Sequence, residues 1–242
     1  MPPRQLVGTE ILDKRGAQVP LDVNLTNQEG KKVTLGKYLN GTNPVILTLG
    51  YYQCPMLCNL VLNGLLTSLK KISLRPGRDF TVVSVSINPK EGVDLAKHKR
   101  LNYLKALGWT EEAEWYFHVG DEKEVRRLAD AIGFQYRFDP REGEYVHSAG
   151  VFILSPTGVV SRVFYGIAYP PQDLKLALVD AGNGKVGSLL DRVILSCFHY
   201  DPDSHKYGVY VMGVMRVGGL LTIVIILAML IFYWRGERRS RR

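Results

Sequence analysis

The chain has 242 residues, of which 46% are hydrophobic and 22% are charged, and its net charge is +8. These proportions fit one sizeable folded domain with a short appendage and exclude an intrinsically disordered chain. Half of the positive excess lies in residues 235–242, which hold five Arg and one Glu. The remainder carries no basic stripe interleaved with aromatic residues, so we expect no nucleic-acid partner.

The first third of the chain predicts a hairpin, a buried strand and a helix. Residues 1–20 are expected to be irregular because Pro2, Pro3 and Pro20 interrupt them. Residues 22–26 and 32–35 alternate around a turn at 27–30, which predicts a hairpin. Residues 45–49, Val-Ile-Leu-Thr-Leu, are apolar enough for a buried parallel strand. A turn then leads to a helix from Cys54-Pro55 to about Ser73, with proline at a favourable first position.

The next hundred residues continue the alternation of strands and helices. Strands are predicted at 80–87, 115–119 and 134–138, and helices at 93–107 and 121–132, the second capped by Asp121. A turn-rich insertion at 139–143 precedes a hairpin of 151–154 and 159–164, and a last helix covers 171–181. This order predicts a thioredoxin-like α/β fold over residues 21–184, with a central mixed sheet flanked by helices.

The C-terminal region predicts one transmembrane helix. Residues 217–234 contain no charge, and as a helix they span about 27 Å, close to the thickness of a bilayer core. Apolar residues extend this run back to Tyr207, so we place the helix at 207–234, after a juxtamembrane linker at 185–206. Tyr233 and Trp234 suit the membrane interface, and the basic tail, 235–242, follows at once.

The positive-inside rule places that tail in the cytoplasm and residues 1–206 on the other side, periplasmic or at the cell surface. Membrane lipid is therefore an expected partner. Residues 1–15 contain no apolar segment of the kind that a signal peptide needs. The two signals conflict, and the predicted topology follows the charge rule.

Cys54 and Cys58 are the strongest chemical signal. Their spacing of four places both on one helix face, and free N–H groups at the start of the helix favour a thiolate at Cys54. Two thiolates suit Cu(I), or zinc with further ligands. Thioredoxin-type redox motifs separate their cysteines by two residues, whereas three lie between these. The spacing favours metal binding but leaves a disulfide open, and two cysteines packed in a core are the third interpretation.

The segment Thr48-Leu-Gly-Tyr-Tyr-Gln-Cys54-Pro-Met-Leu-Cys58 resembles the cysteine motif of the SCO/SenC family, and Tyr145-Val-His147-Ser148 resembles its histidine motif. The resemblance covers residues 20 to 180. It implies a thioredoxin-like domain that binds copper, as Cu(I), Cu(II) or both, through Cys54, Cys58 and His147. It also implies a role in assembling the dinuclear copper centre of cytochrome c oxidase. Without it, a lone histidine before a strand is more often structural.

Three features depart from the family pattern. Asn88 precedes Pro89 where the family usually has an aspartate, Val146 stands where an aspartate commonly precedes the histidine, and the predicted anchor is C-terminal rather than N-terminal. No acidic group is therefore expected beside the ligands at these two positions. The three ligands themselves are unaffected.

Two functions remain open from the sequence. The first is a membrane-anchored copper chaperone, not an enzyme, that delivers copper to the copper-bearing subunit of an oxidase. The second is a thiol–disulfide oxidoreductase that uses Cys54 and Cys58 as a disulfide pair and keeps the copper-ligand cysteines of that subunit reduced. His147 is needed only for the first function.

Several other residues carry weaker signals. Cys197, His199 and His205, with Met212 and Met215, could form a second copper-collecting cluster, although a solvated linker is the simpler interpretation. His98 and His118 are expected to lie on the surface or to be satisfied by hydrogen bonds.

Overall fold

The computed structural model describes two parts of the chain. The first part comprises residues 8–54 and 57–186. The second comprises the strands at 198–201 and 206–209 together with Gly219, Thr222, Ile223, Ile226 and Met229. The chain divides into two compact units, Met1–Gly187 and Ser188–Arg242, and the thioredoxin-like fold belongs to the first.

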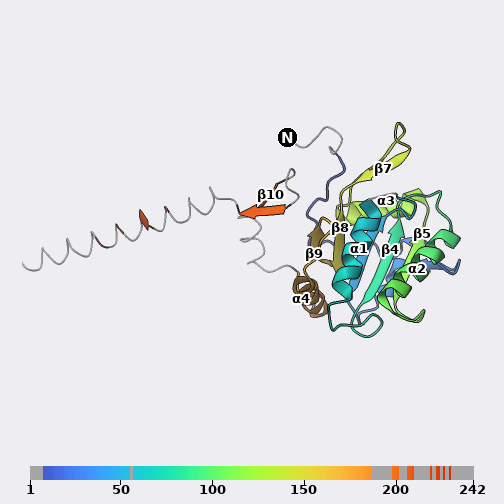
Figure 1. Cartoon of the computed structure of the whole chain (residues 1–242), viewed down its shortest axis with the longest axis horizontal. Helices are drawn as coiled ribbons and strands as arrows, with labels where there is room; N and C mark the ends of the chain where they lie inside the picture. The colour runs from blue at the N-terminus through green and yellow to red at the C-terminus, as the bar shows by residue number, and fades with distance from the viewer. Residues whose placement is uncertain are drawn as a thin grey trace, which may run out of the picture. The chain divides into compact units, whose positions relative to one another are not determined.

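A seven-stranded mixed sheet forms the centre of the first unit, in the order β2-β1-β5-β4-β3-β8-β9 (Figure 1). The three central strands β3, β4 and β5 are parallel to one another, and the outer strands pair antiparallel. The strands of this sheet are β1 (Asn24–Asn27), β2 (Lys32–Thr34), β3 (Val45–Gly50), β4 (Thr81–Ser86), β5 (Trp115–Val119), β8 (Gly150–Leu154) and β9 (Val160–Tyr165).

Helices cover both faces of the sheet and create two hydrophobic cores. Successive side chains of a strand point to opposite faces, so Val45, Leu47 and Leu49 of β3 enter one core and Ile46 enters the other. The first core is covered by α3 (Glu122–Ile132). The second is covered by α1 (Leu57–Leu69), α2 (Val93–Leu107) and α4 (Pro171–Gly182). Because neither face is open to water, β3 is apolar along nearly its whole length.

A separate two-stranded hairpin carries His147. Strands β6 (Tyr136–Asp139) and β7 (Glu144–His147) pair antiparallel, with Tyr136 opposite His147. Gly143 in their turn has φ of 69°, a conformation that glycine adopts without steric cost. The hairpin projects beyond the body of the unit at the top of Figure 1. The sequence predicted no strand at 144–147, whereas His147 ends β7.

The thioredoxin-like α/β fold is confirmed, and nearly all predicted elements are present with small shifts at their ends. The helix after the first cysteine is shorter than predicted, because α1 ends at Leu69 and the chain turns at Lys70 and Lys71. Pro55 and Met56 lie outside the described residues. A short 3-10 helix, η2 (Leu35–Tyr38), follows β2.

The predicted transmembrane segment at 207–234 and the tail at 235–242 lie almost entirely outside the described residues. Within the described part of the chain, no helix has the length and hydrophobicity that crossing a bilayer requires. Residues 207–209 belong to β11 (Lys206–Val209), which pairs antiparallel with β10 (Phe198–Asp201). The start of that range is therefore extended rather than helical. Cys197, His205, Met212 and Met215 are outside the described residues, and His199 is described only as part of β10.

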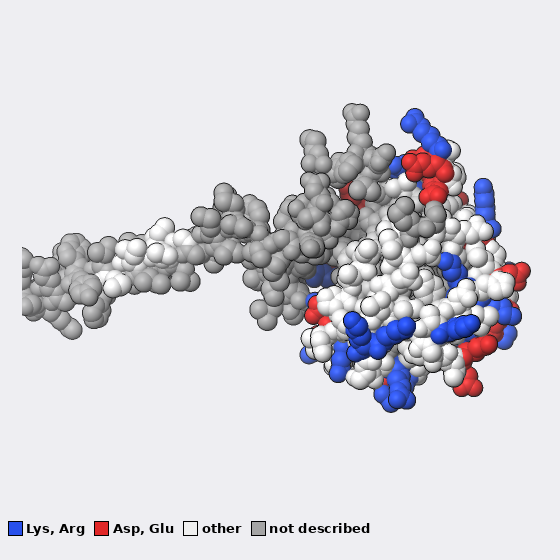
Figure 2. Space-filling model, viewed as in Figure 1, with Lys and Arg blue, Asp and Glu red and all other residues white. Residues whose placement is uncertain are grey.

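The face of the first unit that lies over α1 is mostly uncharged. Figure 2 shows Lys, Arg, Asp and Glu interspersed around the rim of this face and uncharged atoms over its centre, where Figure 1 places α1. Leu60 of α1 leaves 40% of its surface exposed. The outward side of α1 is therefore uncharged, with Leu60 exposed beside the polar residues Asn63 and Thr67.

Candidate functional site

The two cysteines lie where β3 leaves the sheet and enters α1. The carboxyl ends of parallel strands are the usual position of ligand sites in open α/β sheets, because the loops from neighbouring strands meet there. β3 and β4 are parallel and in register from Val45 opposite Thr81 to Gly50 opposite Ser86. The turn at residues 51–54 therefore lies beside the turn that follows Ser86.

Cys58 is buried at the start of α1, with 5% of its surface exposed. Its Sγ accepts the N–H of Tyr51 at 3.4 Å. Gly50 makes this approach feasible, because a Cβ at residue 50 would lie 3.0 Å from that sulfur. Gly50 therefore belongs to the sequence pattern of the site, because its missing side chain leaves room for the thiol of Cys58.

Cys54 is equally buried, with 6% of its surface exposed, and no disulfide joins it to Cys58. Its Sγ accepts the N–H of Cys58 at 3.4 Å. Its own N–H donates to the carbonyl of Tyr51 at 3.3 Å, and its carbonyl accepts Nδ2 of Asn59 at 2.9 Å. The main chain around Cys54 is therefore held on both sides of the residue.

His147 contacts the thiol of Cys58. Its Nε2 lies 3.1 Å from Sγ of Cys58 although the two residues are 89 positions apart in sequence. Nδ1 lies 2.9 Å from the carbonyl oxygen of Ser148. A carbonyl can only accept, so Nδ1 carries the proton and Nε2 presents its lone pair to the sulfur. Burial lowers the pKa of His147, which keeps the ring neutral at physiological pH.

The thiol of Cys58 is held in its protonated form. Its pKa is raised well above the usual value, first by the hydrogen bond with the Cys54 side chain and then by burial. The thiol can donate its proton to Nε2 of His147. A metal ion must displace protons from such a site, so loading is coupled to proton release.

The three predicted ligands are neighbours, but the site is not assembled for a metal. Within the described residues, no group of three His, Cys, Asp or Glu side chains is arranged to hold a metal ion. Cys58 and His147 are in contact, whereas the sulfur of Cys54 faces the N–H of Cys58.

Tyr51 closes the side of the site that faces the hairpin. Its hydroxyl donates to Oε2 of Glu144 in β7 at 3.3 Å, and its ring lies edge-on to the His147 ring with centroids 6.3 Å apart. Burial raises the pKa of Tyr51, and a hydrogen bond with the Cys54 side chain raises it further. The phenol is therefore neutral and links the cysteine turn to the strand of His147.

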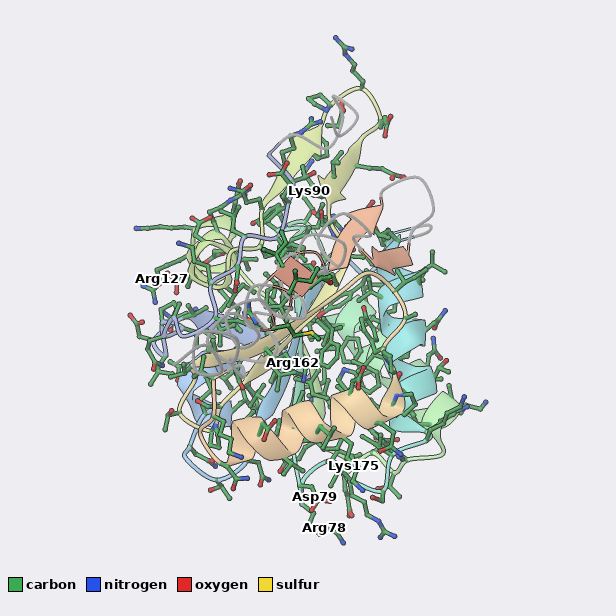
Figure 3. All side chains as sticks on the ribbon, turned by 90° about the vertical axis from the view of Figure 1, so that its left-hand side faces the viewer. Arg78, Asp79, Lys90, Arg127, Arg162 and Lys175 are labelled. Atoms are coloured by element: carbon green, nitrogen blue, oxygen red, sulfur yellow. The ribbon has the colours of Figure 1, made fainter. Side chains whose placement is uncertain are left out.

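Glu91 is the residue that sequence reasoning missed. Its carboxylate accepts the N–H groups of Tyr52 at 2.8 Å and Gln53 at 2.7 Å, immediately before Cys54. The only sequence signal was an acidic residue shortly after β4, next to the β3 turn. In Figure 3 its neighbour Lys90 lies at the end of the unit that carries the hairpin, whereas Arg78, Asp79 and Lys175 lie at the opposite end.

The remaining histidines have structural or surface positions. His118 is fully buried, with Nε2 2.8 Å from the hydroxyl of Tyr38 and Nδ1 3.3 Å from the carbonyl of Ser84. His98 is exposed on α2. The expectation that hydrogen bonds satisfy His118 is confirmed.

A cavity of about 20 Å³ lies behind Cys58. The hydroxyl-bearing residues Thr48 and Ser84 line it together with main chain and apolar side chains. This volume accommodates about one water molecule. The cavity is therefore too small for an organic substrate.

The chain is similar to known proteins in sequence and in structure. A sequence model of the SCO1/SenC family matches residues 14–178, more than half of the chain. No curated protein matches the chain. A putative electron transfer protein of Aquifex aeolicus is similar in structure, with 28% identity, a TM-score of 0.61, and coverage of 71% of this chain and 95% of its own.

Two further structures share the fold at lower identity. BsSco, described as a member of the Sco family of cytochrome c oxidase assembly proteins with a disulfide switch, has 19% identity and a TM-score of 0.55 over 72% of this chain and 99% of its own. ScoI of Arabidopsis thaliana, solved with copper bound, has 21% identity and a TM-score of 0.51 over 70% and 98%. With the family match over residues 14–178, these findings show that the chain belongs to the SCO1/SenC family.

Proposed function

We propose that this protein is a copper chaperone of cytochrome c oxidase assembly, with copper as its cargo and Cys54, Cys58 and His147 as the ligands. The observation that carries the proposal is the contact of 3.1 Å between Sγ of Cys58 and Nε2 of His147, beside a second thiol. Family membership supports it, as do the assignment of BsSco to the oxidase assembly proteins and the structure of ScoI with copper bound.

Loading and transfer follow from the protonation states. Each thiol gives up its proton as its sulfur binds copper, and the lone pair of His147 is already directed at the site. Soft thiolates suit Cu(I), and the imidazole suits both Cu(I) and Cu(II). Transfer to the copper-bearing oxidase subunit proceeds by exchange, in which an incoming ligand replaces one of three while the other two hold the ion.

A Cu(I) competition titration of the reduced full chain tests this proposal. Cys54→Ala and His147→Ala should each weaken Cu(I) binding by more than about 100-fold. Loss of a group that only supports a ligand costs up to about 100-fold, and each of these variants removes a ligand itself. His98→Ala is the matched control, since this histidine is exposed on α2 and should leave the affinity unchanged. Wild-type affinity in both ligand variants would exclude the proposed site.

The second candidate is a thiol–disulfide oxidoreductase. The adjacent, unbridged thiols of Cys54 and Cys58 favour it, and so does the disulfide switch described for BsSco. A disulfide on the partner would be reduced to two thiols as Cys54 and Cys58 form one, by way of a mixed disulfide. His147→Ala should leave this reaction largely intact, and Cys58→Ser should trap the mixed disulfide.

We further propose that the first unit works outside the cytoplasm, tethered by residues 217–234 with the Arg-rich tail inside. The uncharged run and its abrupt basic flank support this topology. Labelling of single cysteines at residues 186 and 240, in a chain whose Cys54, Cys58 and Cys197 are replaced by serine, with a membrane-impermeant reagent in intact cells tests it. The first should react and the second should not.

A further inference from the structure

The turn that precedes Cys54 contains main-chain groups that the sheet does not satisfy. β3 ends at Gly50, and its parallel ladder with β4 ends there too. The N–H groups of Tyr52 and Gln53 therefore need acceptors outside the ladder. A buried N–H without an acceptor costs free energy comparable to a lost hydrogen bond.

Glu91 supplies both acceptors from the neighbouring turn. Its Oε2 lies 2.8 Å from the nitrogen of Tyr52, and its Oε1 lies 2.7 Å from the nitrogen of Gln53. The hydroxyl of Ser86, the last residue of β4, donates to Oε2 at 2.6 Å. Glu91 is 6% exposed, so water does not replace these contacts. One buried carboxylate thus joins the ends of β3 and β4.

Asn88 does not share this task. Its Oδ1 accepts the N–H of Lys90 at 3.0 Å and so stabilises its own turn. Asn88 stands at the position before Pro89 where an aspartate is usual in the family. The carboxylate beside the cysteine turn comes instead from Glu91, three residues later in the chain.

Lys99 and Asn59 form a second chain of hydrogen bonds, which reaches the carbonyl of Cys54. Nζ of Lys99 on α2 donates to Oδ1 of Asn59 at 2.6 Å, and Nδ2 of Asn59 donates to the carbonyl of Cys54 at 2.9 Å. Glu91 lies just before α2, and Lys99 lies within that helix. The segment from Glu91 to Lys99 therefore fixes the main chain on both sides of the Cys54 peptide.

We propose that Glu91 is the positioning residue of the cysteine turn: it fixes the main chain from Tyr52 to Cys54, so that this turn is already ordered when copper binds. The inference rests on the proposed function for its copper step and on the hydrogen bonds alone for its structural step. Without Glu91, assembly of the site would also have to order the turn, and the affinity would fall accordingly.

Glu91→Gln in the full chain tests both steps. An amide carries one acceptor oxygen, so it cannot accept from the two main-chain N–H groups and Ser86 as the carboxylate does. Hydrogen–deuterium exchange of the peptide that contains Tyr52 and Gln53 should become at least tenfold faster. Cu(I) affinity, measured by competition with a chromophoric chelator, should fall by about 10–100-fold, the usual cost of losing a group that orients ligands.

Glu114→Gln is the matched control. Glu114 is partly buried and, like Glu91, accepts a hydroxyl, that of Thr81 at 2.6 Å, but at the opposite end of β4. It should change neither the exchange of the cysteine turn nor the affinity. If Glu91→Gln does not fold, Ser86→Ala takes its place, because it removes one of the three donors and should shift both readouts in the same direction by less.

The outcomes separate the inference from the function on which it rests. A wild-type chain that binds no copper contradicts the proposed function, while the exchange measurement still tests the turn. Wild-type exchange rates in Glu91→Gln would overturn the inference. Faster exchange with unchanged copper affinity in a copper-binding chain would overturn it as well, since Glu91 would then only stabilise the fold.

Discussion

At the scale of single residues, the position of one proton on His147 determines what the site can accept. The carbonyl of Ser148 holds the proton on Nδ1 and leaves Nε2 as a lone pair directed at Cys58. Buried metal-binding histidines are commonly oriented through their second nitrogen in this way. The sequence predicts the histidine, but it cannot predict the tautomer, because the group that selects it is a main-chain oxygen.

His118 predicts a pH dependence of stability. Burial lowers its pKa from 6.5 to about 4 in the folded chain. Above pH 6.5 the residue is neutral in both the folded and the unfolded chain. Between pH 6.5 and 4, His118 binds a proton in the unfolded chain but not in the folded chain. The free energy of unfolding therefore falls as the pH falls, by about 3 kcal/mol in total.

Urea unfolding of the metal-free full chain at a series of pH values measures this dependence. Other groups contribute to acid unfolding, so the informative quantity is the difference between wild type and His118→Asn, whose side chain does not titrate. The variant should lose less stability between pH 6.5 and 4. Parallel curves for the two proteins would contradict the assignment.

At the scale of elements, the end of β3 depends on Gly50. A Cβ at this position would lie 3.0 Å from Sγ and 3.4 Å from Cβ of Cys58. Gly50→Ala should therefore displace Cys58 from His147, lower the free energy of unfolding by about 1–3 kcal/mol and weaken copper binding. Urea unfolding and the Cu(I) titration measure the two effects.

Gly92→Ala is the control for this variant. Gly92 precedes α2 with φ of −100°, and a Cβ there would meet no heavy atom within 4 Å. Its stability and copper affinity should match those of wild type. If Gly50→Ala behaves like Gly92→Ala, the close approach of Cys58 to Gly50 is not required for the site.

The elements also show where prediction from sequence ends. The apolar run Val45–Leu49 and the proline and glycine boundaries predicted most strands and helices, because burial and backbone restriction act locally. Strand β7 was missed, since its four residues show no alternation and pair only with the neighbouring β6. Glu91 was missed because its partners are main-chain N–H groups 38 and 39 residues away, which leave no trace in side-chain identity.

At the scale of the whole molecule, the fold brings together the proposed ligands from two distant segments. Cys54 and Cys58 follow β3, and His147 ends β7, 89 residues after Cys58. Each segment alone carried a recognisable motif, and their order in the chain predicted the pairing. The sequence did not predict the contact between Cys58 and His147, because this contact depends on the orientation of the β6–β7 hairpin against the sheet.

This arrangement predicts that copper stabilises the folded chain. The unfolded chain does not hold three ligands from distant segments together, so the ion binds the folded state preferentially. At a free Cu(I) concentration 100 times the Kd, the gain is about 2.7 kcal/mol. Thermal unfolding with and without buffered Cu(I) measures it, and the gain should disappear in His147→Ala. Equal stabilisation of both proteins would place the copper elsewhere.

Burial of the proposed ligands has a kinetic consequence for the proposed copper transfer. Cys54, Cys58 and His147 expose only 6%, 5% and 3% of their surfaces, so an acceptor cannot touch the cargo until the protein opens locally. Opening is a unimolecular step that precedes the encounter. The rate of copper release should consequently level off as the acceptor concentration increases. The plateau value is the rate at which the buried site around Cys54, Cys58 and His147 opens.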